Sequence, residues 1–141
     1  MMKKGASLLE VVIAIGLISV VLMSLVTLSS KSVSNSNVSK EKNQATRHTQ
    51  ETIEWLRRER DASWSSLDAH VQANSTWCMS QNSWTISGTC NNQPIPNTQF
   101  TRQVTFNKPE ADVIEVAVVT QWQDSGNTHE SRSATILTKW Q

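Results

Sequence analysis

The chain contains few residues that break regular structure or carry chemistry: four glycines, three prolines, two cysteines, three histidines and no tyrosine. No glycine or proline lies between Leu17 and Arg60, so nothing there forbids one long helix. The sequence lacks HExxH, GxSxG and Gly-rich phosphate-binding motifs, and the cysteines and histidines show no zinc-ligand spacing. We therefore expect no catalytic residues, no cofactor and no metal. The formal net charge of +1 gives no strong attraction to nucleic acid, which is not an expected partner.

Residues 1–30 stand apart from the rest of the chain. Lys3 and Lys4 come first, a long apolar run follows, and no charged side chain occurs from 11 to 30. A helix of that length crosses a hydrocarbon core of about 30 Å. One carboxylate, Glu10, interrupts the apolar residues near their start. A charge there costs about 2.5–3.5 kcal/mol at the bilayer centre and less near an end.

Three interpretations of this segment are open. A cleaved secretory signal has an apolar core of about 7–15 residues closed by an A-x-A-like site, and this run is longer and has no such triplet. A simple anchor fits the length, with Glu10 merely tolerated near the membrane interface. In the third interpretation, Glu10 has a partner, because a buried charge needs one.

The third interpretation comes from KKGASLLE, residues 3–10, which resembles the class III signal of type IV pilins and type II secretion pseudopilins. The resemblance implies that prepilin peptidase cuts between Gly5 and Ala6 and that Ala6 is methylated. Glu10 then becomes the fifth mature residue and meets the N-terminal amine of a neighbouring subunit. Ala6 departs from the usual Phe, and the Pro that major pilins often carry around Thr27 is missing.

The lysines before the apolar run predict the orientation of the chain. The positive-inside rule keeps Lys3 and Lys4 cytoplasmic, so the residues after 30 lie outside. The resemblance implies an inner-membrane, single-pass protein that later enters a pilus or pseudopilus at the cell surface or in the periplasm. The implied partners are prepilin peptidase, other pilin or pseudopilin subunits, the inner-membrane assembly platform and, before assembly, the lipid bilayer.

We expect a leader at 1–5, an assembly helix at 6–30, an amphipathic stem helix at 31–61 and a globular head at 62–141. The stem's apolar stripe has helical spacing, although the Ser/Asn-rich stretch before it also fits a linker. Acidic residues interleave with the arginines near its end, which predicts a solvated face rather than a DNA-binding one. The stripe consists of Ala45, Thr49, Thr52, Ile53 and Leu56.

The first part of the head, 62–99, is expected to be loop-rich. A short turn or second helix is predicted at 62–71, and a short strand at 85–87. Cys78 and Cys90 form neither a CxxC pair nor a zinc motif. Because the head is predicted to lie outside, we expect these two cysteines to form a structural disulfide.

The last part, 100–141, is predicted to be an antiparallel β-meander that the stem helix covers, which gives an α+β, pilin-like fold. Turn chemistry falls at 107–110 and 124–127. Alternation predicts three inward faces, and Arg102 is the polar exception on the first. The faces are Phe100, Val104 and Phe106; Ile114, Val116, Val118, Thr120 and Trp122; and Ala134, Ile136, Thr138 and Trp140.

Two functions follow from these observations. The first is a structural subunit, minor rather than major, of a type IV pilus, secretion pseudopilus or competence system. The alternative is a filament-tip or membrane-anchored binding module, an adhesin or DNA receptor, which uses Trp77 and Trp84 of the loop region as contacts. No residues support an enzyme.

Overall fold

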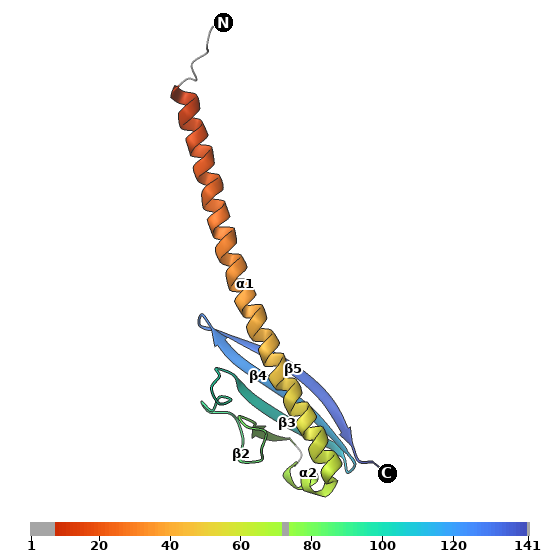
Figure 1. Ribbon diagram of the computed structural model, residues 1–141. Helices are drawn as coiled ribbons and strands as arrows, with labels where there is room; N and C mark the ends of the chain where they lie inside the picture. The colour runs from red at the N-terminus through yellow and green to blue at the C-terminus, as the bar shows by residue number, and fades with distance from the viewer. Residues whose placement is uncertain (1–7, 72–73, 141) are drawn as a thin grey trace. The chain divides into compact units, whose positions relative to one another are not determined.

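The computed structural model describes residues 8–71 and 74–140. The chain divides into two compact units, one ending at Ser39 and the other beginning at Lys40. Helix α1, Leu8–Ala62, contributes to both units (Figure 1). In the first unit the described residues are all helical, and their large apolar side chains are exposed except for that of Val38, which is half-buried.

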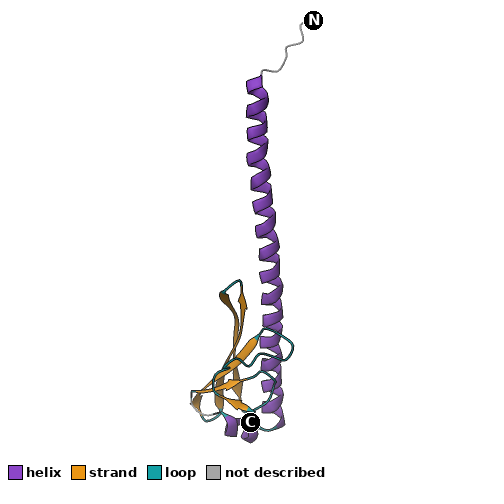
Figure 2. Ribbon diagram, turned by 90° about the vertical axis from the view of Figure 1, so that its left-hand side faces the viewer, coloured by secondary structure: helices purple, strands orange, loops and turns teal. Residues whose placement is uncertain are grey.

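The second unit is an α+β fold, as the sequence predicts. The part of α1 from Lys40 onward runs along one face of an antiparallel sheet, and a short helix, α2, follows it (Figure 2). The strand order is β2-β1-β3-β4-β5. The bounds are α2 Trp64–His70, β1 Ser75–Cys78, β2 Ile86–Ser87, β3 Thr101–Glu110, β4 Val113–Asp124 and β5 Asn127–Thr138.

The apolar stripe of α1 is buried as predicted. The buried residues of this helix are the five that the periodicity selects: Ala45, Thr49, Thr52, Ile53 and Leu56. Leu56 packs in one core cluster with Phe106, and Ala45 joins a second cluster with Trp122. The hydroxyls of Thr49 and Thr120 lie 2.8 Å apart between helix and sheet. Apolar burial and paired hydroxyls together hold the helix on the sheet.

The inward faces of β3 and β4 also agree with the alternation. Val104, Phe106 and Val118 are fully buried, and Arg102 is buried beside them with only 3% of its surface exposed. The pairing of Phe106 with Val116 in the β3–β4 register keeps large apolar residues on the helix side. Burial of such side chains stabilises the fold by about 1.5–3 kcal/mol each.

The prediction of which residues of the last strand face inward is wrong. Leu137 and Ser131 of β5 are buried, whereas Ile136 is 61% exposed and Trp140, beyond the strand end, is 70% exposed. Pairing of Ile114 with Leu137 turns the odd-numbered residues of β5 toward the helix. At this edge the inner face accepts polar groups, because the helix supplies partners for them: the Ser131 hydroxyl lies 3.0 Å from that of Thr46.

Two local predictions also need correction. The turn expected at 107–110 lies further on, because β3 continues to Glu110 and pairs with Val113. Pro109 instead sits within an irregularity of the strand register, where its missing N–H does no harm. The region expected to be loop-rich contributes β1, which inserts beside β3. The predicted 124–127 turn is confirmed: Ser125 and Gly126 both have positive φ, as a two-residue type I′ hairpin requires.

Candidate functional site

The apolar part of α1 is the first candidate site. Among the described residues, α1 is the one helix long and apolar enough to cross a membrane. Glu10 lies in its first turn. A carboxylate there interacts favourably with the helix dipole, by about 0.3–1 kcal/mol. Gly5 and Ala6, the expected cleavage and methylation residues, lie outside the described part of the chain.

Four of the five hydroxyl side chains between 8 and 30, all but that of Ser29, are hydrogen-bonded within the helix. Ser19, Ser24, Thr27 and Ser30 each donate to the main-chain oxygen four residues earlier, at 2.8 to 3.1 Å. A hydroxyl paired in this way does not need a water molecule or a second helix. Glu10 is therefore the polar side chain of this segment that most needs an external partner.

The predicted disulfide is present. Cys78 ends β1 and Cys90 lies in the loop after β2, and their sulfur atoms are bonded. Cys78 is buried, and the bridge links the loop after β2 to β1. The loop also contains Ile95, whose N–H donates to the Phe100 oxygen at 2.7 Å.

The structure brings Trp77 and Trp84 together, with ring centroids 5.3 Å apart and an edge-to-face geometry. Trp84 also stacks on His70 at 4.7 Å. Both indoles are half-buried against the core, and both N–H groups are paired, Trp77 with the His70 oxygen and Trp84 with the Glu59 carboxylate. Such packing is what a structural cluster needs. Their use as ligand contacts stays a prediction.

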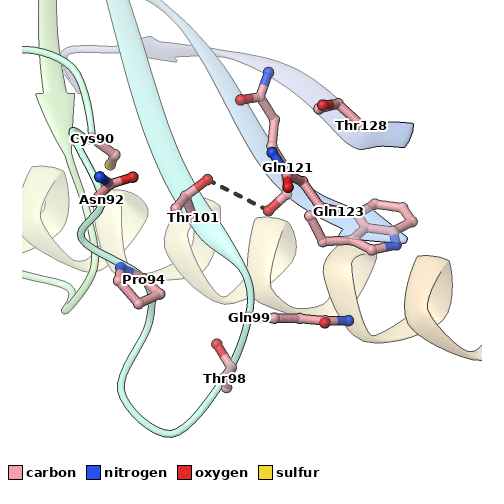
Figure 3. A pocket seen from close by; sticks show the side chains of 10 residues that line it. Cys90, Asn92, Pro94, Thr98, Gln99, Thr101, Gln121, Gln123 and Thr128 are labelled. Carbon is pink, nitrogen blue, oxygen red and sulfur yellow. Dashed lines mark hydrogen bonds between the residues drawn. The ribbon is translucent and has the colours of Figure 1, made fainter. Parts of the chain in front are cut away.

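Sequence reasoning missed a hollow of about 560 Å³ at the end of the sheet where β4 and β5 extend beyond the start of β3. Its walls come from the loop between β2 and β3 and from the ends of β3, β4 and β5 (Figure 3). A cluster of Asn, Gln and Thr in the loop sequence was the available signal. The lining residues are Cys90, Asn92, Pro94, Thr98, Gln99, Thr101, Gln121, Trp122, Gln123 and Thr128.

Within residues 8–71 and 74–140, no group of three or more His, Cys, Asp or Glu side chains is arranged to hold a metal ion. No family model matches the chain, and neither does any curated protein or solved structure. The functional argument therefore rests on the residues and the geometry themselves.

Proposed function

We propose that this chain is a structural subunit, of the minor kind, in a type IV pilus or a related pseudopilus. The first part of α1 anchors it in the inner membrane and later packs in the filament. Glu10 is the observation that carries this proposal, because it is the sole charged side chain from 5 to 30. A plain anchor has no use for a carboxylate that weakens insertion.

The proposal gives Glu10 a partner. Cleavage after Gly5 by prepilin peptidase creates a new N-terminal amine, and in a packed filament the amine of one subunit meets Glu10 of the next. Truncation of one member of a buried ion pair is costly because the other charge is left without compensation. The same contact repeated from subunit to subunit is heterologous, so it propagates an open assembly.

The second unit is compatible with this role. A helix that covers one face of a small antiparallel sheet is the fold that the resemblance implies, and the small size of the chain, 15.8 kDa, fits a minor component. The outward orientation predicted from Lys3 and Lys4 is supported by the Cys78–Cys90 bond, since disulfides persist outside the cytoplasm. The assembly platform and other pilin or pseudopilin subunits are the proposed partners.

Mass spectrometry of the mature N-terminus in the native host tests the processing step. The proposal expects a chain that begins at Ala6 when the prepilin peptidase is present and an uncut chain when that peptidase is deleted. A mature chain that retains Met1, or one cut after the apolar run, contradicts the proposal.

Replacement of the carboxylate tests the assembly step. Glu10→Ala should insert in the membrane as well as the parent chain, while its incorporation into filaments falls by at least about tenfold, because the neighbouring amine loses its partner. Ser24→Ala is the matched control: its hydroxyl bonds only within the helix, so assembly should not change. Normal incorporation of Glu10→Ala would show that this carboxylate is only tolerated.

A further inference from the structure

We infer that the hollow shown in Figure 3 binds a neutral saccharide. The inference concerns the second unit alone and does not depend on filament assembly. It starts from the chemistry of the lining, which consists of four carboxamides, three threonine hydroxyls, a proline, an indole and a bridged cysteine, with no charged side chain among them.

The lining offers free hydrogen-bonding capacity. Across the part of the chain that the structure describes, the side chains of Asn92, Gln123 and Thr128 make no hydrogen bond. Gln121 reaches only the Glu130 carboxylate, at 3.5 Å. Each carboxamide offers two donors and an acceptor, and each hydroxyl offers both functions. A ligand dense in neutral hydroxyl groups matches this mixture.

The charges behind the lining disfavour anions. Gln99 Nε2 and Trp122 Nε1 donate to opposite oxygens of Glu41, each at 2.8 Å. Glu130, beside Gln121, is a second carboxylate. Arg132 pairs with the other oxygen of Glu130 at 3.6 Å, but the charged groups that bond directly to lining side chains are both acidic. A phosphate, a nucleic acid or an acidic glycan would therefore meet a carboxylate rather than a cation next to the lining.

The wall of the hollow is held in place before any ligand binds. The loop carrying Asn92 and Pro94 is fastened at Cys90 by the disulfide to β1. The opposite wall consists of paired strands, with Gln121 and Gln123 projecting from β4 (Figure 3). Pre-ordered groups lose little entropy on binding. The volume, about 560 Å³, lies within the range of small-molecule sites.

The hollow offers mainly side-chain groups to a ligand, which favours a saccharide over an extended peptide. An extended peptide gains affinity by pairing with an exposed strand edge. At this hollow β4 is paired with both β3 and β5 as far as Gln121, and the edge free of β3 beyond it is short, from Trp122 to Asp124, so it offers little main-chain pairing to a peptide. Trp122 is only 3% exposed, so it forms part of the wall and does not present a ring face for stacking. Recognition by hydrogen bonds alone predicts a dissociation constant on the order of 1 mM.

The test is NMR titration of the full chain, labelled with ¹⁵N, in a detergent without a sugar headgroup. The probes are maltotetraose, cellotetraose and the tetramer of N-acetylglucosamine, with a heparin tetrasaccharide as the anionic control. At least one neutral probe should shift the side-chain amides of Asn92, Gln121 and Gln123. The anionic control should leave them unshifted at the same concentration.

A double variant sharpens the assignment. Gln121→Ala with Gln123→Ala, both at exposed strand positions, should weaken binding at least about fivefold. Gln103→Ala is the matched control, because Gln103 lies on the same outer face of the sheet but outside the hollow. It should leave the dissociation constant within about twofold of the parent value.

Three outcomes overturn the inference. No shift with any neutral probe at about 10 mM excludes a saccharide site of the expected strength. An unchanged response in the Gln121 and Gln123 variant places the binding elsewhere. A neutral Gly-Ser peptide that shifts the same amides more tightly than every sugar makes the occupant a polypeptide.

Discussion

Arg102 of β3 and His48 of α1 are joined across the buried interface of helix and sheet: Nη1 of the guanidinium donates to the His48 main-chain oxygen at 2.8 Å. Its Nε donates to the Met79 oxygen at 2.9 Å, and Glu51 Oε2 lies 3.8 Å from Nη1. Burial lowers the pKa of Arg102 to about 10, against the opposing effect of Glu51. The guanidinium therefore stays charged at neutral pH and ties α1, β3 and the residue after β1 together.

Arg102→Met should lower the free energy of unfolding by about 2–4 kcal/mol, because the buried Met79 carbonyl and the part-buried His48 carbonyl both lose a charged donor. The measurement is chemical denaturation of the full chain in detergent. Arg132→Met, at an exposed position of β5, is the matched control and should change stability by less than about 0.5 kcal/mol. Equal losses in the two variants would contradict the role given to Arg102.

The sign of the pH dependence at Arg102 follows from its lowered pKa. Below pH 10 the guanidinium is charged in both the folded and the unfolded chain, and burial makes the charge cost stability. That cost shrinks only as the pH rises through about 10, where the folded chain begins to release the proton first. Between pH 5 and 8, Arg102 should therefore contribute no pH dependence to unfolding.

Because of the hydroxyl pair of Thr49 and Thr120, the Thr49→Val and Thr120→Val variants should lose different amounts of stability. Thr49 also donates to the Ala45 oxygen at 3.0 Å, so it accepts from Thr120. Thr49→Val strands the fully buried Thr120 hydroxyl and should cost about 1–2 kcal/mol, whereas Thr120→Val leaves the Ala45 bond intact and should cost less. In a double-mutant cycle, the double variant should recover part of the loss. Strict additivity would contradict a direct hydroxyl–hydroxyl bond.

Sequence patterns predicted the fold where one face of an element is strongly apolar. The stripe of α1 and the alternation of β4 select the residues that are buried, because both elements meet the centre of the core. The pattern failed in β5, where the outward Ala134 and Ile136 are more apolar than the inward Ser131 and Ser133. An edge strand only partly covered by a helix is not selected for one apolar face.

The candidate sites also differ in how far the sequence alone could predict them. The importance of Glu10 and of the cysteine pair can be argued from the sequence, since an isolated charge in an apolar run and a single pair of cysteines can be recognised without knowledge of the fold. The hollow beside Gln121 cannot be, because its lining joins a loop to the ends of three strands. The packing of Trp77 on Trp84 likewise depends on β1, a strand whose four residues carry no clear alternation.

Removal of the disulfide should destabilise the fold but leave the strands of the sheet paired. Cys78→Ala with Cys90→Ala should lower the free energy of unfolding by about 3 kcal/mol, because the bridge closes a loop of 12 residues in the unfolded chain. Denaturation with and without a reductant measures this loss. The reductant should destabilise the parent chain by a similar amount and leave the double variant unaffected. Labelling of both thiols in the exported, non-reduced parent would contradict the bond.

The contact that Asp61 makes with Arg60 and Trp140 at the end of α1 should depend on pH. Asp61 Oδ1 accepts from Arg60 Nε at 2.8 Å and from Trp140 Nε1 at 3.1 Å, and the Arg60 guanidinium lies 4.9 Å from the Trp140 ring centroid. The hydrogen bond from Arg60, and next that from Trp140, hold the pKa of Asp61 below its ordinary value of 3.8. A lowered carboxyl pKa means that the contact is complete above pH 3.8 and is lost as the pH falls through the folded-state value.

NMR titration of the Asp61 side-chain carbonyl carbon checks this order of causes. Arg60→Met should raise the pKa of Asp61 more than Trp140→Phe does, and each variant should leave part of the shift in place, because the other donor remains. Trp64→Phe is the control, since Trp64 does not bond to Asp61 and its replacement should not move the titration. A larger effect of Trp140→Phe than of Arg60→Met would mean that the indole, rather than the neighbouring guanidinium, dominates the carboxylate at the helix end.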